Sequence, residues 1–197
     1  MKNFFESRFE YNPMPKLNLD GVSFKNISRV DNEVLCNSIS VIKIFEAVSQ
    51  CGSSKSPDPD GFNFFFIKSN WDTIGQDIVK AILRFQDTGY ISRGCSTSFI
   101  TLVPKKDNPS SLNEFRSILL VGCVYKILSK VLANRLKKIL PSVIDMNQST
   151  FLEGRGLLDS ILVANETVDF LKNENLSGVC VKVDFEKAYD SVDLYRY

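Results

Sequence analysis

An aspartate near the end of the chain has the setting of a metal ligand. Residues 179–185 have the sequence VCVKVDF. Side chains of a β-strand alternate between its faces, so three valines share one face and Asp184 lies on the other, at the tip of the strand. An aspartate there can hold Mg²⁺, an ion that takes a few hard oxygen ligands and keeps waters and substrate phosphates for the rest. The same residue type caps turns such as the following FEKAYDSV, so a phosphoryl-transfer site and a structural cap both remain open.

A cluster of basic residues in the middle of the chain is a second candidate for chemistry. Between Thr101 and Leu140 eight basic residues stand against two acidic ones, a local excess of six in a chain with a net charge of only +1. Such a stretch can bind phosphates, although charge alone also fits a solvated helical face. The basic residues are Lys105, Lys106, Arg116, Lys126, Lys130, Arg135, Lys137 and Lys138; the acidic ones are Asp107 and Glu114.

Composition excludes several classes of site. The chain has no histidine, which excludes Ser-His-Asp triads, Cys-His pairs and histidine metal ligands. Its five cysteines are odd in number and never form a C-x-x-C pair, so we expect reduced, mostly buried thiols and no zinc site. No run of about 18 apolar residues and no secretory signal is present. We therefore expect an intracellular protein, nuclear or cytoplasmic, without a membrane partner.

The elements that position these residues predict an α+β fold, helix-rich with one antiparallel hairpin. We expect helices from Ser40 as N-cap, from about Asp72 to Gly89, over 122–140 and over 157–171, with Pro141 ending the third. The runs TSFITLVPK and EFRSILLV predict the hairpin, with KDNPSSLN as its loop. Strands and helices do not alternate regularly, which argues against a doubly wound sheet. Residues 1–37 show weak periodicity and are predicted to be a poorly specified lead-in.

The predicted helix over 122–140 has one broad apolar arc. On helical spacing Lys126, Lys130 and Lys137 fall on the opposite side, whereas Arg135 falls within the arc. A buried guanidinium needs partners, so we expect an acid or backbone carbonyls to bind Arg135. The arc consists of Val124, Ile127, Leu128, Val131, Leu132, Leu136, Ile139 and Leu140.

Several motifs, taken together, resemble a known family. KSPDPDGFNFFFIK, SFITLVPKKDNPSSLNEF and the continuous stretch 115–192 closely resemble the reverse transcriptase domain of LINE-type non-LTR retrotransposons, in a plant-like form. The resemblance covers roughly residues 38–193. It implies the N-terminal portion of a right-hand polymerase, with the fingers subdomain and the first palm strand in residues 38–197.

The resemblance implies roles around the terminal strand. Asp184 matches the aspartate that binds both catalytic Mg²⁺ ions, and Phe185 occupies a position that supplies a backbone ligand. Tyr189 matches the aromatic gate beneath the incoming sugar, and Asp190 is a supporting residue. The implied substrates are deoxynucleoside triphosphates, an RNA template and a DNA primer.

Two further groups follow from the same resemblance. Lys105 and Arg116 look like the fingers residues that grip the incoming triphosphate, with a solvated lysine and a surface ion pair as their structural alternatives. Gln148, Gly154 and Arg155 are similar to the family's template- and primer-binding loop, and a helix-capping loop is the alternative there.

Departures from the family's pattern limit what the chain is expected to do. Asp58 stands where the family usually has glycine, adding negative charge near nucleic acid, and Ser117 replaces a proline beside Arg116. No two aspartates are adjacent anywhere in the 197 residues, so the second catalytic carboxylate motif is missing. We expect a truncated fragment that is inactive by itself. A nucleic-acid-binding relic without chemistry is the main alternative; a Mg²⁺-dependent phosphatase is a third, although Glu186 stands where it would need aspartate.

Overall fold

The computed structural model describes residues 2–9, 20–21, 23–145, 148, 152 and 154–179. It divides the chain into two units, one of residues 24–148 and one of residues 1–23 with 149–197. Each unit is described by itself below. The predicted terminal strand lies outside the described residues.

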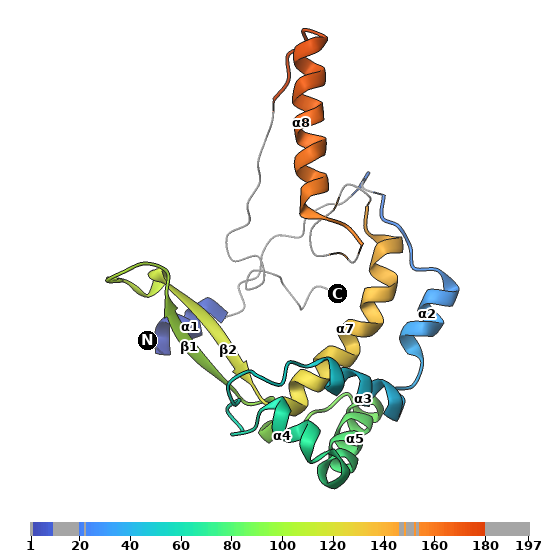
Figure 1. The fold of residues 1–197 in the computed structure, drawn as a ribbon, viewed down its shortest axis with the longest axis vertical. Helices are drawn as coiled ribbons and strands as arrows, with labels where there is room; N and C mark the ends of the chain where they lie inside the picture. Colours follow the sequence, from blue (N-terminus) through green and yellow to red (C-terminus); the bar gives the residue numbers. More distant parts are fainter. Residues whose placement is uncertain are drawn as a thin grey trace. The chain divides into compact units, whose positions relative to one another are not determined.

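A helical core forms the centre of the 24–148 unit (Figure 1). The helices α3 (Val41–Gln50), α4 (Phe64–Ser69), α5 (Trp71–Thr88) and α7 (Cys123–Val143) turn their apolar faces to one cluster. Ile44, Ile82 and Ile127 are almost completely shielded from solvent, as the amphipathic spacing of their helices requires. The cluster consists of Ile39, Ile44, Ala47, Val48, Phe64, Ile67, Ile78, Ile82, Cys123, Ile127, Leu128 and Val131.

Local capping signals set the boundaries of α3 and α5. The Ser40 side chain accepts a hydrogen bond from the backbone N–H of Lys43, which satisfies one of the free donors at a helix start. Gly89 ends α5 with a φ of 66°, a left-handed conformation that glycine adopts without a steric penalty. Both predicted helices are thereby confirmed. The short helix α4, capped by Asn63, was not predicted.

Helix α7 continues beyond the proline that was predicted to end it. Pro141 lies inside the helix, which ends at Val143, and the N–H of Ile144 still donates to Leu140 O at 2.9 Å. The prediction was wrong because the φ of proline is fixed near the helical value, so the helix continues through Pro141 for two more residues although the proline has no N–H to donate. Leu132 and Leu136 of the predicted apolar arc are exposed.

Arg135 joins α7 to helix α2 (Arg29–Cys36). Its Nη1 donates to Leu35 O at 3.0 Å, so the predicted tie to a backbone carbonyl is confirmed. Its Nε and Nη2 atoms are buried and find no acceptor within the described part of the chain. Helix α2 lies in the predicted lead-in of residues 1–37, and the domain boundary after residue 37 stays a prediction.

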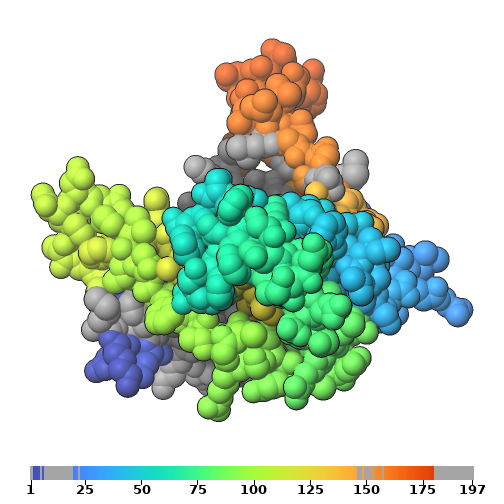
Figure 2. All heavy atoms as spheres, turned by 60° about the horizontal axis from the view of Figure 1, so that its bottom comes forward, coloured from blue at the N-terminus to red at the C-terminus, as the bar shows by residue number. Residues whose placement is uncertain are grey.

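The predicted hairpin is confirmed as strands β1 (Ser98–Pro104) and β2 (Phe115–Val121), which pair antiparallel. The short helix α6 (Arg93–Ser96) precedes β1, and the 3₁₀ turn η1 (Leu112–Glu114) precedes β2. Figures 1 and 2 both show the hairpin extending away from the helical core. The N–H of Lys105 donates to Glu114 O at 2.7 Å. Because bonded and non-bonded pairs alternate along an antiparallel ladder, Ser117 falls in a non-bonded pair and its N–H points away from β1.

The other unit contains two described helices, α1 (Lys2–Phe9) and α8 (Leu157–Asn173). Helix α8 confirms the helix predicted over 157–171 and is two residues longer. No helix among the described residues has the length and apolar character needed to cross a membrane.

The cysteines differ from their prediction. Of the four that the structure describes, Cys36 is exposed, Cys51 and Cys95 are partly buried, and only Cys123 is buried. These four are free thiols, as predicted, but the expectation that most cysteines are buried was wrong. Wide spacing in the sequence carries no information about burial.

Candidate nucleic-acid interface

The hairpin brings Lys105 and Arg116 to one face. Val103 pairs with Arg116 across the ladder, and directly opposed side chains share a face. Lys105 follows Val103 by two residues, so it lies on that face too. Arg116 is exposed, and its side chain forms no hydrogen bond or ion pair with any residue that the structure describes. The Lys105 Nζ donates to Asn113 O at 2.9 Å.

Glu114 is the acid nearest to Arg116 in the sequence, but its partner is Lys106. The Lys106 Nζ lies 2.6 Å from Glu114 Oε1, and Glu114 Oε2 accepts from the N–H groups of Ser110 at 2.6 Å and Ser111 at 3.3 Å. The bond from Lys106 and those from the serines hold the pKa of Glu114 below its ordinary value. Glu114 therefore does not neutralise the charge of Arg116.

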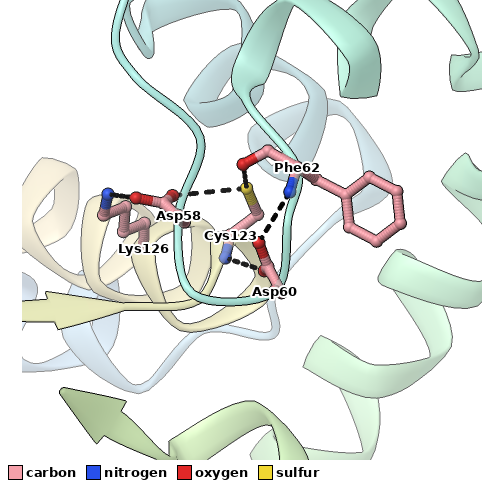
Figure 3. A network of polar contacts seen from close by, with 5 residues as sticks. All are labelled: Asp58, Asp60, Phe62, Cys123 and Lys126. Carbon is pink, nitrogen blue, oxygen red and sulfur yellow. Dashed lines mark hydrogen bonds and ion pairs between the residues drawn. The ribbon is translucent and has the colours of Figure 1, made fainter.

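A network of polar contacts lies where the loop 51–63 meets the start of α7 (Figure 3). Asp60 binds both sides of the junction: its Oδ2 accepts from the N–H of Cys123 at 2.8 Å and its Oδ1 from the N–H of Phe62 at 3.1 Å. The N-cap residue Gly122 has no side chain to satisfy the free N–H groups of α7. A Cβ at Gly122 would lie 2.9 Å from Asp60 Oδ2, so the close approach of this carboxylate requires glycine there.

Asp58 forms the second half of the network. Its side chain is only 7% exposed and pairs with Lys126, which is 35% exposed. The Cys123 Sγ lies 3.4 Å from Asp58 Oδ2 and 3.5 Å from Phe62 O. Burial, the charge of Asp60 and the contact with Asp58 raise the pKa of the Cys123 thiol to about 12. The predicted position of Lys126 on a face opposite the core is therefore incomplete, because its ammonium is held by the loop.

Asp58, Asp60 and Cys123 lie close together, with potential ligand atoms within 4.8 Å of one another. Their polar atoms already have partners within the fold: Asp58 is paired with Lys126, and both Asp60 oxygens accept backbone hydrogen bonds. The raised pKa of about 12 keeps the Cys123 thiol protonated at neutral pH in this arrangement. The arrangement caps a helix and closes a loop.

The other predicted site residues are only partly visible. Asp184, Phe185, Tyr189 and Asp190 lie outside the described residues. Nothing in the structure therefore tests the predicted Mg²⁺ site, the aromatic gate or the supporting acid.

The predicted template loop is described in part. Gln148 is exposed, and its N–H donates to Asp145 O at 3.1 Å. Gly154 has a φ of 77°, which glycine adopts readily, and the N–H of Arg155 donates to Leu152 O at 3.3 Å. Gln148 belongs to one unit and the other two residues to the second. Their shared role stays a prediction.

The sequence analysis missed the part that Asp60 plays in the fold. A signal was present: α7 begins after a glycine and has no capping side chain in its own sequence, so an acceptor from elsewhere was required. The loop with two aspartates at 58 and 60 was one candidate source of this acceptor.

Comparison with known proteins places the central and C-terminal part of the chain in a family. Residues 103–196 match the family described as reverse transcriptase (RNA-dependent DNA polymerase). This segment is similar to the reverse transcriptase family. The match includes Arg116 and Asp184, two of the residues assigned by resemblance.

Two proteins similar to the chain come from transposable elements. The chain is 29% identical over 167 residues to the Transposon TX1 uncharacterized 149 kDa protein of Xenopus laevis, an alignment of 85% of the chain and 13% of that protein. It is 26% identical over 160 residues to the putative 115 kDa protein in type-1 retrotransposable element R1DM of Drosophila melanogaster, covering 79% and 15%. These relatives support the LINE-type, non-LTR assignment. The chain spans about one seventh of their length, and its plant-like character stays a prediction.

Proposed function

We propose that the chain is the fingers and the first palm strand of a LINE-type RNA-directed DNA polymerase. The observation that carries the proposal is the family match over residues 103–196, which includes the hairpin strand β2, α7 and Asp184. In support, β1 and β2 form the expected hairpin, and Arg116 extends from it into solvent.

The grip on phosphates is assigned to the hairpin. Lys105 and Arg116 share one face, and the planar guanidinium of Arg116 can donate two parallel hydrogen bonds to phosphate oxygens. Since Glu114 binds Lys106 instead, the cation stays available for a nucleoside triphosphate or a nucleic-acid backbone. Gln148, Gly154 and Arg155 are proposed to contact template or primer.

Asp184 is proposed to hold Mg²⁺ together with the backbone carbonyl of Phe185, since both supply the hard oxygen donors that this ion prefers. Mg²⁺ ions, when bound, activate the primer 3′-hydroxyl and stabilise the leaving pyrophosphate. Tyr189 is proposed to lie beneath the incoming sugar, and Asp190 to support the site. One aspartate does not organise two ions, so the 197-residue chain is proposed to be inactive by itself.

Primer extension and RNA binding test the two halves of this proposal. On a primed RNA template with Mg²⁺ and deoxynucleoside triphosphates, the chain should incorporate no nucleotide above background. Incorporation that is abolished in Asp184→Ala would overturn the proposed inactivity.

In the binding half, fluorescence anisotropy follows a labelled single-stranded RNA at several salt concentrations. The Lys105→Ala/Arg116→Ala variant should bind more weakly, and the slope of log K against log salt should fall by about 1.4, the value for two lost phosphate contacts on a single strand. Lys80→Ala/Arg84→Ala is the matched control, because it removes one lysine and one arginine from exposed positions of α5. Equal effects of the two pairs would refute the hairpin assignment.

A further inference from the structure

A cavity of about 240 Å³ lies between the loop 51–63 and helix α7, within the 24–148 unit. We name it the loop pocket. Its walls carry three ammonium groups, those of Lys55, Lys126 and Lys130, and a single carboxylate, that of Asp58. At about 30 Å³ per water molecule in the liquid, this volume holds roughly eight waters, which leaves room for a polyatomic anion with part of its hydration shell.

A fourth lysine, Lys68, lies next to the pocket without lining it. The Lys68 Nζ donates to Ser49 O at 2.9 Å, Cys51 O at 2.6 Å and Ser53 Oγ at 3.1 Å. These three neutral oxygens use the ammonium protons without cancelling the charge. Lys68 therefore fixes the backbone at the pocket's edge and adds to its positive potential.

The Cys51 thiol also lines the pocket. Burial raises the pKa of Cys51, while Lys130, Lys68, Lys126 and Lys55 each act to lower it. Three of these lysines, Lys55, Lys126 and Lys130, line the same pocket as Cys51. Asp58 pairs with Lys126, and the Asp60 carboxylate lies within 4.8 Å of Asp58. Four ammonium groups therefore stand against two carboxylates, which leaves an excess of positive charge at the pocket.

Asp58 already neutralises one of these lysines, Lys126. Its carboxylate pairs with Lys126 and is 7% exposed, and Figure 3 shows it between the Lys126 ammonium and the Cys123 sulfur. Lys55 and Lys130 form no ion pair with any residue that the structure describes. The aspartate is thus an internal anion in a site that has unused cations beside it.

We propose that the loop pocket binds a phosphate group through Lys55, Lys126 and Lys130, and that Asp58 competes with this phosphate for Lys126. Compact, strongly charged ammonium groups that converge from a loop and a helix suit a multiply charged oxyanion. The phosphate belongs either to a free polyphosphate or to a nucleic-acid backbone. The second source rests on the proposed function above; the first does not.

Inorganic pyrophosphate is the first probe. Its binding to the full chain is measured by titration, with the chemical shifts of the backbone amides recorded by NMR. Saturable shifts are expected at Gly52, Ser56 and Lys130. Lys130→Gln should weaken binding roughly tenfold, the loss expected for one charge-assisted contact. Lys138→Gln removes the same charge from an exposed position on the same helix and should change the affinity less than twofold. Amide shifts that do not saturate, or an equal loss of pyrophosphate affinity in both variants, would refute phosphate binding in the loop pocket.

Asp58→Asn tests the competition. Removal of the internal anion should tighten pyrophosphate binding several-fold, whereas an unchanged or weaker affinity in the folded variant would refute the role of Asp58. If Asp58→Asn does not fold, Asp58→Glu replaces it, because this variant keeps the negative charge. Asp58→Glu should bind pyrophosphate as tightly as the parent. A several-fold tighter affinity of Asp58→Glu would refute the role of Asp58.

A short single-stranded RNA then distinguishes the two sources of phosphate. If RNA displaces pyrophosphate from the same amides and is weakened by Lys130→Gln, the source is the nucleic-acid backbone. If RNA affinity depends on Lys105 and Arg116 alone, and pyrophosphate still binds in the loop pocket, the phosphate in this pocket comes from a free polyphosphate. RNA binding at neither place, with pyrophosphate bound, would refute the proposed RNA partner and leave the pocket intact.

Discussion

The start of helix α7 depends on a carboxylate 63 residues away in the sequence, and this dependence can be measured. Asp60→Ala leaves the N–H groups of Cys123 and Phe62 without the acceptor they have in the structure. Loss of a helix-capping side chain costs about 1 kcal/mol, and loss of a negative charge near a helix N-terminus adds about 0.3–1 kcal/mol. We expect the free energy of unfolding to fall by about 2 kcal/mol.

Gly122→Ala should act through the same carboxylate. Gly122 has φ −65° and ψ 162°, a conformation that alanine adopts without strain. Its Cβ would meet only Asp60, with Oδ2 at 2.9 Å and Cγ at 3.7 Å, so the clash must displace the cap. The lost cap costs about 1–2 kcal/mol, and the lower entropy of the unfolded alanine chain returns about 0.5 kcal/mol. A net loss of about 1 kcal/mol follows.

The sign of this effect should reverse when Asp60 is absent. In the Asp60→Ala background nothing else lies within 4 Å of the new methyl group, so Gly122→Ala should stabilise the protein by about 0.5 kcal/mol. The coupling energy of the double-mutant cycle is then about 1.5 kcal/mol. Urea unfolding followed by circular dichroism measures all four variants, and unchanged m-values would show that the unfolded state is not affected.

Gly94→Ala is the matched control for this cycle. A Cβ at Gly94 also meets nothing within 4 Å, and its φ is not positive. Its effect should be the same with and without Asp60. The reasoning is refuted if Gly122→Ala destabilises both backgrounds equally, because the conflict would then be with something other than the Asp60 carboxylate.

Three further predictions concern Arg135, Cys123 and Ser117. Arg135→Met should cost less than about 1 kcal/mol in urea unfolding, because it also removes two buried nitrogens that lack acceptors among the described residues; a loss above 3 kcal/mol would reveal a partner beyond them. With a folded-state pKa of about 12 against 9.0 for a free thiol, Cys123 stabilises the fold fully below about pH 9 and loses this contribution as the pH rises toward 12. At pH 8, iodoacetamide should therefore label exposed Cys36 quickly and Cys123 only after unfolding, as read by mass spectrometry. Ser117→Pro should leave far-ultraviolet circular dichroism and the melting temperature nearly unchanged, because the N–H at this position is outside the ladder; loss of the hairpin amide signals would contradict this.

Local signals in the sequence were enough to place most of the elements. Ser40 and Gly89 marked helix ends through contacts within a few residues, and the hairpin followed from two β-rich runs around a polar loop. Helix α4 escaped prediction because it has six residues, too few for a periodic pattern. The helix end was misplaced at Pro141 because the φ of proline is compatible with a helix, which here continues to Val143.

The polar contacts of the candidate site were less predictable because they join distant segments. The amphipathic pattern required a partner for Arg135, but it could not show that the partner is the carbonyl of Leu35, 100 residues away. Likewise Asp58 looked like an added negative charge near nucleic acid, and only the structure pairs it with Lys126 across 68 residues. Such pairs are fixed by tertiary packing, and no spacing in one segment encodes them.

The folded chain also presents its basic residues differently from the count in its sequence. The excess of six between Thr101 and Leu140 is reduced where Glu114 binds Lys106 and where Asp58, from outside that stretch, binds Lys126. What remains near these pairs is divided between the hairpin, with Arg116, and the loop pocket, with Lys130. Exposed charges more than a Debye length apart, about 8 Å at physiological salt, act almost independently, so a phosphate bound at one place should gain little from distant lysines. Variants at these two places therefore report more about function than the net charge does.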